Sequence, residues 1–265
     1  MSTPSSFDLQ KKNVFVCDLD GTLFMGKRPI VPAIRFVNRL ADTFEFYYLT
    51  NNTSKTPAAY LEKLQGAGIR TDAEHILTPL VTLEAYIREQ GYASVYLVAN
   101  GLVFKHLAAR LPEVRFEYAH GANRLVALTY DTELTYEKLR CAAALLNADM
   151  SLDYVATHGD ACCPSEEGPI PDVGGLIALL RVTNGREPSQ IFGKPSPSLL
   201  APVLRRFAPD EIAVVGDRLY TDKAMADAAG IDFVCVLSGE TTRESLDVYC
   251  GTRPSLVLET LGDLA

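Results

Sequence analysis

The sequence lacks any apolar run that could cross a membrane. A membrane-spanning helix needs about 18 or more consecutive apolar residues, and no such run occurs among the 265 residues. The first eight residues are polar and contain no basic segment followed by an apolar core, so we expect no secretory signal. These absences predict a cytoplasmic protein without a membrane partner.

Paired cysteines and clustered histidines are also missing. The six cysteines, at positions 17, 141, 162, 163, 235 and 250, include no Cys-x-x-Cys pair. Without an export signal, this pattern predicts reduced thiols. Cys162 and Cys163 are adjacent, but no histidine cluster accompanies them, so we expect no metal site there.

Basic residues are outnumbered by acidic ones. Lys and Arg total 25 against 33 Asp and Glu, which gives a net charge of −8. Nucleic-acid polymers normally require a basic surface, so the composition argues against such a partner. It does not argue against a small anionic substrate, because a bound cation inverts the local field. The remaining composition is that of a globular protein with one or two domains.

An acidic motif follows the first strand-like segment. The apolar run 14–17 is typical of a strand buried on both faces. Asp18 and Asp20 come where that strand should end, and Gly21 lets the chain turn away. Open α/β folds bind ligands at this edge of the sheet, so we interpret the motif as a site with a nucleophile, a proton carrier and a cation. The alternative is an ordinary turn, for which Asp and Gly are common.

A second strand-like run also ends in polar side chains. Residues 44–49 are followed by Thr50, Asn51 and Asn52, just before a predicted helix. The unpaired N–H groups and positive dipole at the start of a helix favour an anion. The alternative is a plain helix cap, since the same residue types are the usual caps.

Two later segments supply a lysine and two more acids. Lys194 lies after a strand-like run and before a Pro-x-Pro turn, and a surface lysine is the alternative reading. Asp217 and Asp222 follow the apolar run 211–216 and would also serve as a helix cap and first-turn acid. Each alternative is as good as a functional role when taken singly. Four such segments at the boundaries of predicted elements are hard to explain by capping alone.

Strand and helix patterns alternate along the whole chain. Strands are predicted over 95–98 and 152–156, and helices over 79–90 and from Asp131 through Asn147. Alternation of this kind predicts an α/β fold with a mainly parallel sheet and right-handed crossovers. The four polar segments would then meet at one sheet edge.

Together these side chains suit phosphoryl transfer through an aspartyl-phosphate. One carboxylate serves as nucleophile, and a second protonates the leaving oxygen and later activates water. Thr50, backbone N–H groups and Lys194 supply donors and positive charge to the phosphate. Mg²⁺ would offset the repulsion between carboxylates and a dianionic substrate, with Asp18 and Asp217 as its natural ligands.

The four motifs resemble those of the haloacid dehalogenase (HAD) superfamily. Its motifs are similar to Asp18-x-Asp20-Gly21-Thr22, Leu49-Thr50-Asn51-Asn52, Gly193-Lys194-Pro195-Ser196-Pro197 and Gly216-Asp217-x4-Asp222. The second and third motifs look like the NagD-like branch of phosphatases, which includes 4-nitrophenyl-, nucleotide- and phosphoglycolate-type enzymes. The resemblance implies a Rossmann-like core and hydrolysis of a phosphate ester, because the second acid separates phosphatases from dehalogenases and P-type ATPases.

The resemblance also implies a role for each residue. Asp18 would be the nucleophile and Asp20 the acid/base. Mg²⁺ would be held by the carboxylates of Asp18 and Asp217 and the main-chain carbonyl of Asp20. The phosphate would be bound by Thr50, Asn51, Asn52 and Lys194. Asp222 would order metal-bound waters or Lys194.

The gap between Asn52 and Lys194 is too long for one crossover helix. We therefore predict a core of residues 1–78 and 190–265, with residues 79–189 as an inserted α/β domain. The family likeness implies a "C2-type" cap that excludes water and selects a small phosphorylated metabolite, and it suggests a homodimer through this cap.

The loop 156–160 resembles a substrate-contacting cap loop of NagD-like enzymes. Asp160 matches the acid of that loop, whereas His158 and Gly159 depart from its usual Asn-Pro. Asp160 would then orient the leaving group, with His158 or Cys163 as neighbours. The alternative is that Asp160 is a turn residue.

Two functional alternatives remain at this point. One is a phosphotransferase that uses the same aspartyl-phosphate with an acceptor other than water. The other is a non-catalytic regulator that binds phosphate, against which the full set of acids and Lys194 argues. The sequence does not name the substrate, for which a sugar phosphate and a nucleoside monophosphate are the leading classes.

Overall fold

The protein forms two compact units in a computed structural model that describes residues 7–118, 124–163 and 168–264. Residues 1–6 of the polar N-terminus lie outside the described residues. The first unit comprises the residues up to Thr50, Ala58–Leu77 and Lys194 onward. The second comprises Asn51–Pro57 and Thr78–Gly193. The expected division into 1–78 with 190–265 and 79–189 did not foresee that Asn51–Pro57 makes its contacts with the second unit.

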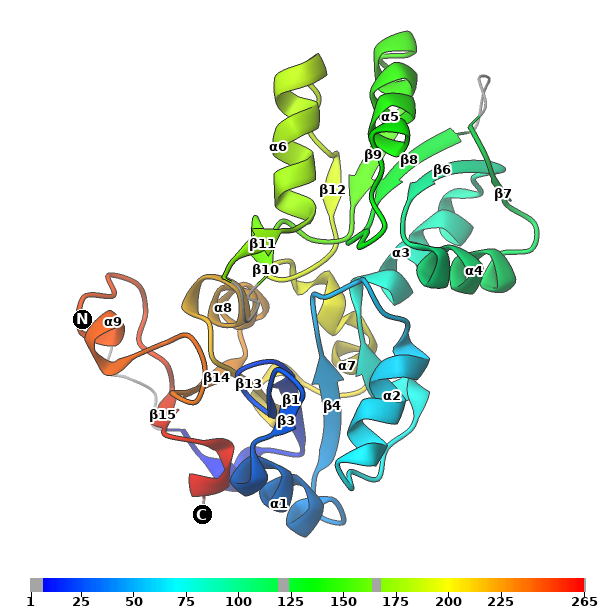
Figure 1. The fold of residues 1–265 in the computed structure, drawn as a ribbon. Coiled ribbons are helices and arrows are strands. Elements are labelled where there is room, and N and C mark those ends of the chain that lie inside the picture. Colours follow the sequence, from blue (N-terminus) through cyan, green and yellow to red (C-terminus); the bar gives the residue numbers. More distant parts are fainter. Residues whose placement is uncertain (1–6, 119–123, 164–167, 265) are drawn as a thin grey trace. The chain divides into compact units, whose positions relative to one another are not determined.

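The first unit is built on a six-stranded parallel sheet in the order β15-β14-β13-β1-β4-β5 (Figure 1). Its strands are β1 (Val14–Asp18), β4 (Glu45–Leu49), β5 (Ile76–Leu77), β13 (Ile212–Gly216), β14 (Asp232–Val236) and β15 (Leu256–Leu258). A short hairpin of β2 (Phe24–Met25) and β3 (Arg28–Pro29) follows β1. Because β1 pairs with both β13 and β4, Asp18 reaches the middle of the carboxyl edge.

Helices cover both faces of this sheet, so every residue of β1 is buried. Phe15 and Cys17 pack into the core cluster formed with α1 (Val31–Leu40) and α2 (Pro57–Gly66). Val14 and Val16 point to the opposite cluster, formed with α7 (Ala201–Leu204), α8 (Ala224–Ala229) and α9 (Arg243–Asp247). The alternation of side chains along a strand thus anchors β1 from both sides.

The second unit has its own parallel sheet in the order β12-β9-β8-β6-β7 (Figure 1). Its strands are β6 (Ser94–Val98), β7 (Arg115–Phe116), β8 (Arg124–Leu128), β9 (Asp153–Ala156) and β12 (Gln190–Ile191). The helices α3 (Pro79–Gln90) and α4 (Gly101–Arg110) contribute to one core cluster, and α5 (Tyr136–Ala148) and α6 (Val173–Asn184) to the other. A hairpin of β10 (Cys162–Cys163) and β11 (Ile170–Pro171) precedes α6.

The helix that was expected to begin at Asp131 begins later. Thr135 caps α5 by accepting a hydrogen bond from the N–H of Lys138 at 3.3 Å. The Asp131 carboxylate instead accepts from the N–H of Glu133 at 2.8 Å and from Lys138 Nζ at 2.6 Å. The prediction of this boundary was wrong because Asp131 starts a turn with the same side-chain chemistry that starts a helix.

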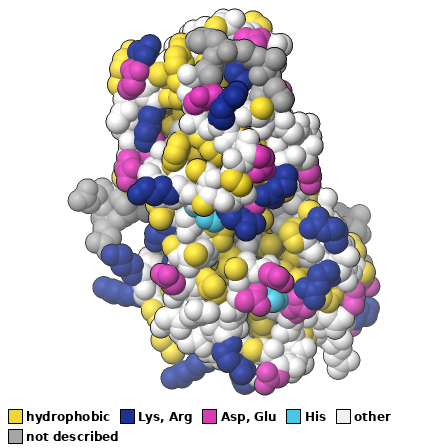
Figure 2. All heavy atoms as spheres, turned by 90° about the vertical axis from the view of Figure 1, so that its right-hand side faces the viewer, with side chains coloured by type: hydrophobic (Ala, Val, Ile, Leu, Met, Phe, Trp, Pro, Cys, Tyr) yellow, Lys and Arg dark blue, Asp and Glu magenta, His cyan; other side chains and the backbone are white. Residues whose placement is uncertain are grey.

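The charges on the face drawn in Figure 2 are mixed. No helix among the described residues is both long and apolar enough to cross a membrane. On the face drawn in Figure 2, the coloured Lys and Arg side chains alternate with Asp and Glu side chains. No broad basic area is visible on the coloured part of that face.

Candidate active site

Lys194 joins two carboxylates at the carboxyl edge of the first unit's sheet. Its Nζ donates to Asp18 Oδ1 at 2.5 Å and to Asp222 Oδ1 at 2.6 Å. Asp18 ends β1, whereas Asp222 comes from a π-helical turn, Leu219–Lys223, that leads into α8. The three side chains are at most 8% exposed, so these ion pairs are little screened by water and salt.

Asp217 lies between two glycines that leave no room for a side chain. A Cβ on Gly21 would lie 2.3 Å from Asp217 Oδ2, and one on Gly239 would lie 2.0 Å from the same atom. Asp217 Oδ2 accepts a hydrogen bond from the N–H of Glu240 at 2.7 Å. No described residue offers a hydrogen bond to the buried Oδ1. One oxygen therefore fixes the carboxylate, and the other is left for a ligand.

Asp20 lies on the loop after β1 and is more accessible than the other acids. Its side chain is 47% exposed, and its Oδ1 lies 3.1 Å from Nζ of Lys63 on α2. The same ammonium lies 4.3 Å from the centre of the Phe24 ring. Asp20 is thus held from the side by a lysine while its carboxylate still reaches solvent, as a residue that exchanges protons must.

The segment after β4 is divided between the two units. Asp18 is in register with Leu49, so Thr50 lies at the same edge of the sheet, where it is buried. Asn51 belongs to the second unit, where its Nδ2 donates to Asp160 Oδ2 at 3.1 Å. Asn52 Oδ1 accepts from the N–H and the hydroxyl of Ser54, at 3.0 and 2.7 Å. The Asn52 carbonyl oxygen is thus used in this turn. The contact between Asn52 and phosphate remains a prediction.

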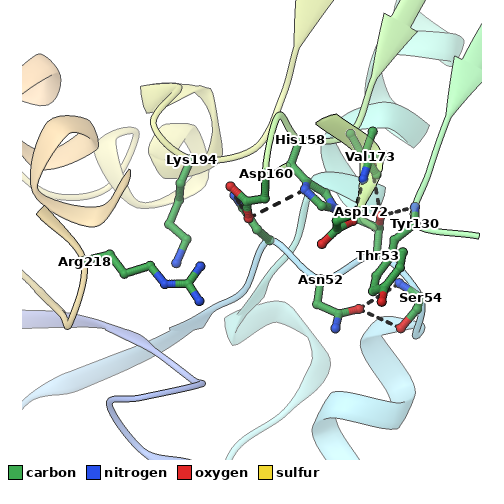
Figure 3. A network of polar contacts seen from close by, with 12 residues as sticks. Asn52, Thr53, Ser54, Tyr130, His158, Asp160, Asp172, Val173, Lys194 and Arg218 are labelled. Carbon is green, nitrogen blue, oxygen red and sulfur yellow. Dashed lines mark hydrogen bonds and ion pairs between the residues drawn. The ribbon is translucent and has the colours of Figure 1, made fainter. Parts of the chain in front are cut away.

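The loop after β9 is organised around His158, which is fully buried. Its Nδ1 lies 3.7 Å from Asp160 Oδ2, and its Nε2 lies 3.4 Å from Oδ1 of Asp172, the residue that caps α6 (Figure 3). The main chain is tied as well, because the N–H of Gly174 donates to the carbonyl of Asp160 at 2.8 Å. Cys162 and Cys163 follow in β10. The loop is therefore a built feature of the second unit.

Burial and mutual repulsion set the protonation of the core carboxylates. Burial raises the pKa of Asp18 well above its usual range, Lys194 lowers it in part, and Asp222 and Asp217 add to the rise. Burial, with Asp222, raises the pKa of Asp217 to about 6. Burial alone would lower the pKa of Lys194, but Asp18 and Asp222 outweigh it and raise that pKa. The cluster thus holds more negative charge than one ammonium neutralises.

This arrangement fits a divalent cation that prefers oxygen ligands. Oxygens of Asp18, Asp217 and Asp222 lie within 4.8 Å of one another. Asp222 is engaged on both sides, by Lys194 at Oδ1 and by the N–H of Arg218 at Oδ2, 3.1 Å away. Asp18 and Asp217 are therefore better placed than Asp222 to bind Mg²⁺, which takes few carboxylates and demands near-octahedral geometry.

Comparison with known families agrees with the fold and the four motifs. Residues 15–113 match the family described as Haloacid dehalogenase-like hydrolase, and residues 191–264 match the family described as HAD-hydrolase-like. The chain belongs to the haloacid dehalogenase superfamily and is one of its phosphatases. Phosphatases of this superfamily generally depend on a divalent metal ion.

Two of the similar proteins are phosphatases by name. The chain is 32% identical over 243 residues to the acid sugar phosphatase of Staphylococcus aureus (strain USA300), a match that covers 90% of this chain and 91% of that protein. It is similar to the crystal structure of 4-nitrophenylphosphatase from Thermotoga maritima, with a TM-score of 0.88, 33% identity and 97% of each chain covered. NagD from E. coli K-12 shares the fold, with a TM-score of 0.84, 22% identity, and 96% of this chain and 98% of that chain covered.

Sequence reasoning missed two cations of the site. Lys63 is the only basic residue of α2, but the sequence does not say which face of a helix meets Asp20. Arg218 immediately follows Asp217, and its place directly after a strand-end acid was the available signal. Neither was predicted, because the four motifs assign roles to their acids, to the polar residues 50–52 and to Lys194, and to no other cation.

Proposed function

We propose that this phosphatase hydrolyses a small phosphomonoester, with Mg²⁺, through a phosphorylated Asp18. The observation that carries the proposal is the pairing of Lys194 with Asp18 and Asp222 beside an Asp217 oxygen that no described residue engages. A buried lysine here neutralises the nucleophile's repulsion for a dianionic phosphate. The sugar phosphates and nucleoside monophosphates are the proposed substrate classes.

The reaction would proceed in two displacements at phosphorus. An oxygen of Asp18 attacks the phosphorus and the ester oxygen leaves, while Asp20 donates a proton to that oxygen. Asp20 then accepts a proton from water as the water oxygen attacks the same phosphorus, which releases inorganic phosphate and restores the Asp18 carboxylate. Lys194 and Thr50 would hold the phosphate oxygens through both steps, because charge develops on these oxygens in the transition state.

The carboxylates of Asp18 and Asp217 and the main-chain carbonyl of Asp20 would hold the Mg²⁺. When bound, the ion supplies positive charge to the carboxylates and to a phosphate oxygen. Asp222 would position Lys194, to which it is bonded at 2.6 Å.

The substitution Asp18→Asn tests the nucleophile. An amide cannot form the acyl phosphate, so we expect turnover of 4-nitrophenyl phosphate to fall by at least about 10⁴-fold. Asp42→Asn is the matched control, because the Asp42 side chain is 91% exposed. Near-normal turnover by a folded Asp18→Asn protein would disprove the mechanism. Product analysis with added glycerol separates hydrolysis from phosphotransfer, since a transferase would yield glycerol phosphate.

We further propose that the second unit selects the substrate through the loop that holds Asp160. The support is the fixed conformation of this loop, in which His158 and the N–H of Gly174 secure Asp160. The substitution Asp160→Ala should change relative rates across a panel of phosphate esters. An unchanged panel would remove the loop from substrate selection.

A further inference from the structure

Arg218 is a second cation at the acidic cluster, and nothing above assigns it a task. It follows Asp217 at the end of β13, and its side chain is 19% exposed. Its backbone N–H donates to Asp222 Oδ2 at 3.1 Å, the carboxylate whose other oxygen binds Lys194. Asp222 therefore fixes Lys194 and the backbone of Arg218 together.

One edge of the guanidinium is held by Glu240. Arg218 Nε lies 3.0 Å from Glu240 Oε2 in an ion pair, and the hydroxyl of Tyr220 donates to the same oxygen at 3.0 Å. The backbone N–H of Glu240 meanwhile secures Asp217. Glu240 thus aligns the arginine with the proposed metal ligand. No described residue accepts a hydrogen bond from either Nη group of Arg218, so the fork of the guanidinium is available.

The two cations act on the same carboxylates. Arg218 and Lys194 both lower the pKa of Asp217, and Asp18 helps to raise the pKa of each cation. Figure 3 shows the guanidinium of Arg218 beside the ammonium of Lys194. Lys194 has two carboxylate partners, whereas the Nη groups of Arg218 have none among the described residues.

We propose that Arg218 is a substrate-binding residue whose Nη groups bind the outer oxygens of the phosphoryl group at Asp18. This inference rests on the proposed function. A guanidinium presents two parallel N–H donors, which match two oxygens of one phosphate better than a single ammonium does. Lys194 would then bind the phosphate as a point charge and Arg218 as a fork.

The proposal makes opposite predictions for phosphate and for Mg²⁺. An arginine that binds phosphate strengthens phosphate binding. The same positive charge, near Asp217 and Asp18, opposes a metal cation. Removing it should weaken one ligand and strengthen the other. A merely structural arginine would weaken both when replaced, because the acidic cluster would lose its shape.

The test measures both ligands without turnover. Inorganic phosphate is titrated by calorimetry into the Mg²⁺-saturated protein, and Mg²⁺ is titrated into the metal-free protein by its effect on the melting temperature. For Arg218→Met we expect phosphate binding to weaken roughly 10- to 100-fold and the half-saturating Mg²⁺ concentration to fall roughly two- to fivefold. Arg218→Lys should restore the Mg²⁺ value but only part of the phosphate affinity. Arg243→Met is the control, because Arg243 is 70% exposed and pairs with Glu259.

Two outcomes would overturn the inference. Phosphate affinity within twofold of the original protein in Arg218→Met, or in Arg218→Lys should the first variant not fold, would exclude phosphate binding by this side chain. Parallel weakening of phosphate and Mg²⁺ would assign it a structural role. Both outcomes leave the proposed function standing if Asp18→Asn abolishes turnover, whereas active Asp18→Asn would remove the proposed function itself.

Discussion

Gly21 lies where a side chain would collide with Asp217. Its φ of +91° is a conformation that L residues rarely adopt. The hydroxyl of Ser238 donates a hydrogen bond to the carbonyl of Gly21 at 2.6 Å and so holds this backbone in place. Two separate requirements, backbone conformation and space, therefore favour glycine at this position. The second requirement connects it to the proposed metal site, because the atom it would displace belongs to Asp217.

Comparing Gly21→Ala with Gly26→Ala should separate the effect of backbone conformation from the effect of the contact with Asp217. In Gly21→Ala the added Cβ would lie 2.3 Å from Asp217 Oδ2, so we expect Mg²⁺ binding and turnover to fall by at least about 10-fold along with stability. Gly26→Ala is the matched control: φ is +61° there, and no atom lies within 4 Å of the added Cβ. It should cost only about 1 kcal/mol of stability. Denaturant unfolding and Mg²⁺ titration measure both effects, and equal Mg²⁺ affinity in the two variants would contradict the prediction.

Single residues show how far sequence reasoning reached. Asp18, Asp217, Asp222 and Lys194 were expected together because each follows or precedes an apolar run that reads as a strand, and parallel strands end at one edge. The structure brings these four together. The contacts of Lys63 and Arg218 were not foreseen, because they depend on helix orientation and on loop contacts that no local pattern encodes.

The start of α6 shows the same close packing at the level of an element. A Cβ on Gly174 would lie 2.4 Å from the carbonyl oxygen of Gly159, which is main chain and cannot swing aside. A Cβ on Gly175 would lie 3.5 Å from the carbonyl oxygen of Ala161, an ordinary contact. Neighbouring glycines of one helix thus face different surroundings, and only the first lets the loop that holds Asp160 approach.

We therefore expect opposite effects from two adjacent alanine substitutions. Gly174→Ala should destabilise the protein by roughly 1–3 kcal/mol, since the helix and the loop must move apart. Gly175→Ala should be neutral or stabilising by up to about 1 kcal/mol, because alanine favours the helix. Urea unfolding compares the two. A Gly174→Ala protein as stable as Gly175→Ala would show that the loop does not rely on this contact.

Elements were predictable where periodicity or burial was strong. The helix predicted over 79–90 agrees with α3, which begins at Pro79 and is capped by Gly91. The strand predicted over 152–156 agrees with β9, three of whose four residues are buried. The segment Asn51–Pro57 was expected with the core. Its actual contacts, from Thr53 to Thr157 at 2.9 Å and to the N–H of Tyr130 at 2.9 Å, join residues over 70 positions apart, which local pattern cannot reveal.

For the whole molecule, the buried acids make stability depend on pH and metal. The pKa of Asp217 rises from 3.8 to about 6 on folding. The folded protein thus binds this proton more tightly than the unfolded chain does. The protonated Asp217 carboxyl therefore contributes to the free energy of unfolding below about pH 4, and this contribution is lost as the pH rises through 6. A cation that binds the carboxylate would offset the loss at high pH.

Metal-free protein should therefore lose up to about 3 kcal/mol of stability between pH 4 and pH 8 through Asp217. The Asp217→Asn side chain cannot ionise, so at pH 8 the metal-free variant should be more stable than the metal-free original protein. This difference in stability should shrink as the pH falls toward 4. Saturating Mg²⁺ should stabilise the original protein and leave Asp217→Asn little changed. Thermal unfolding across pH, with and without Mg²⁺, measures all three effects. Equal pH dependence in the two proteins would contradict the assigned pKa.

Hydrogen exchange would locate the Mg²⁺ response within the chain. The two units have separate cores. Mg²⁺ should therefore increase protection more at β1, which carries Asp18, and at β13, which leads to Asp217, than at β8 or β9.

The chain leaves the first unit after Thr50, returns to it at Ala58, leaves it again after Leu77 and re-enters it at Lys194. Thr50 and Lys194, the two residues proposed to hold the phosphate, are therefore the last residue before the first crossing into the second unit and the first residue after the final crossing back. An insertion of even one or two residues directly after Thr50 or directly before Lys194 would displace a phosphate-binding side chain. The same insertion between Leu77 and Thr78 would leave both side chains in place. A chimaera that replaces the second unit with that of a relative must therefore keep the Thr50–Asn51 and Gly193–Lys194 connections unchanged.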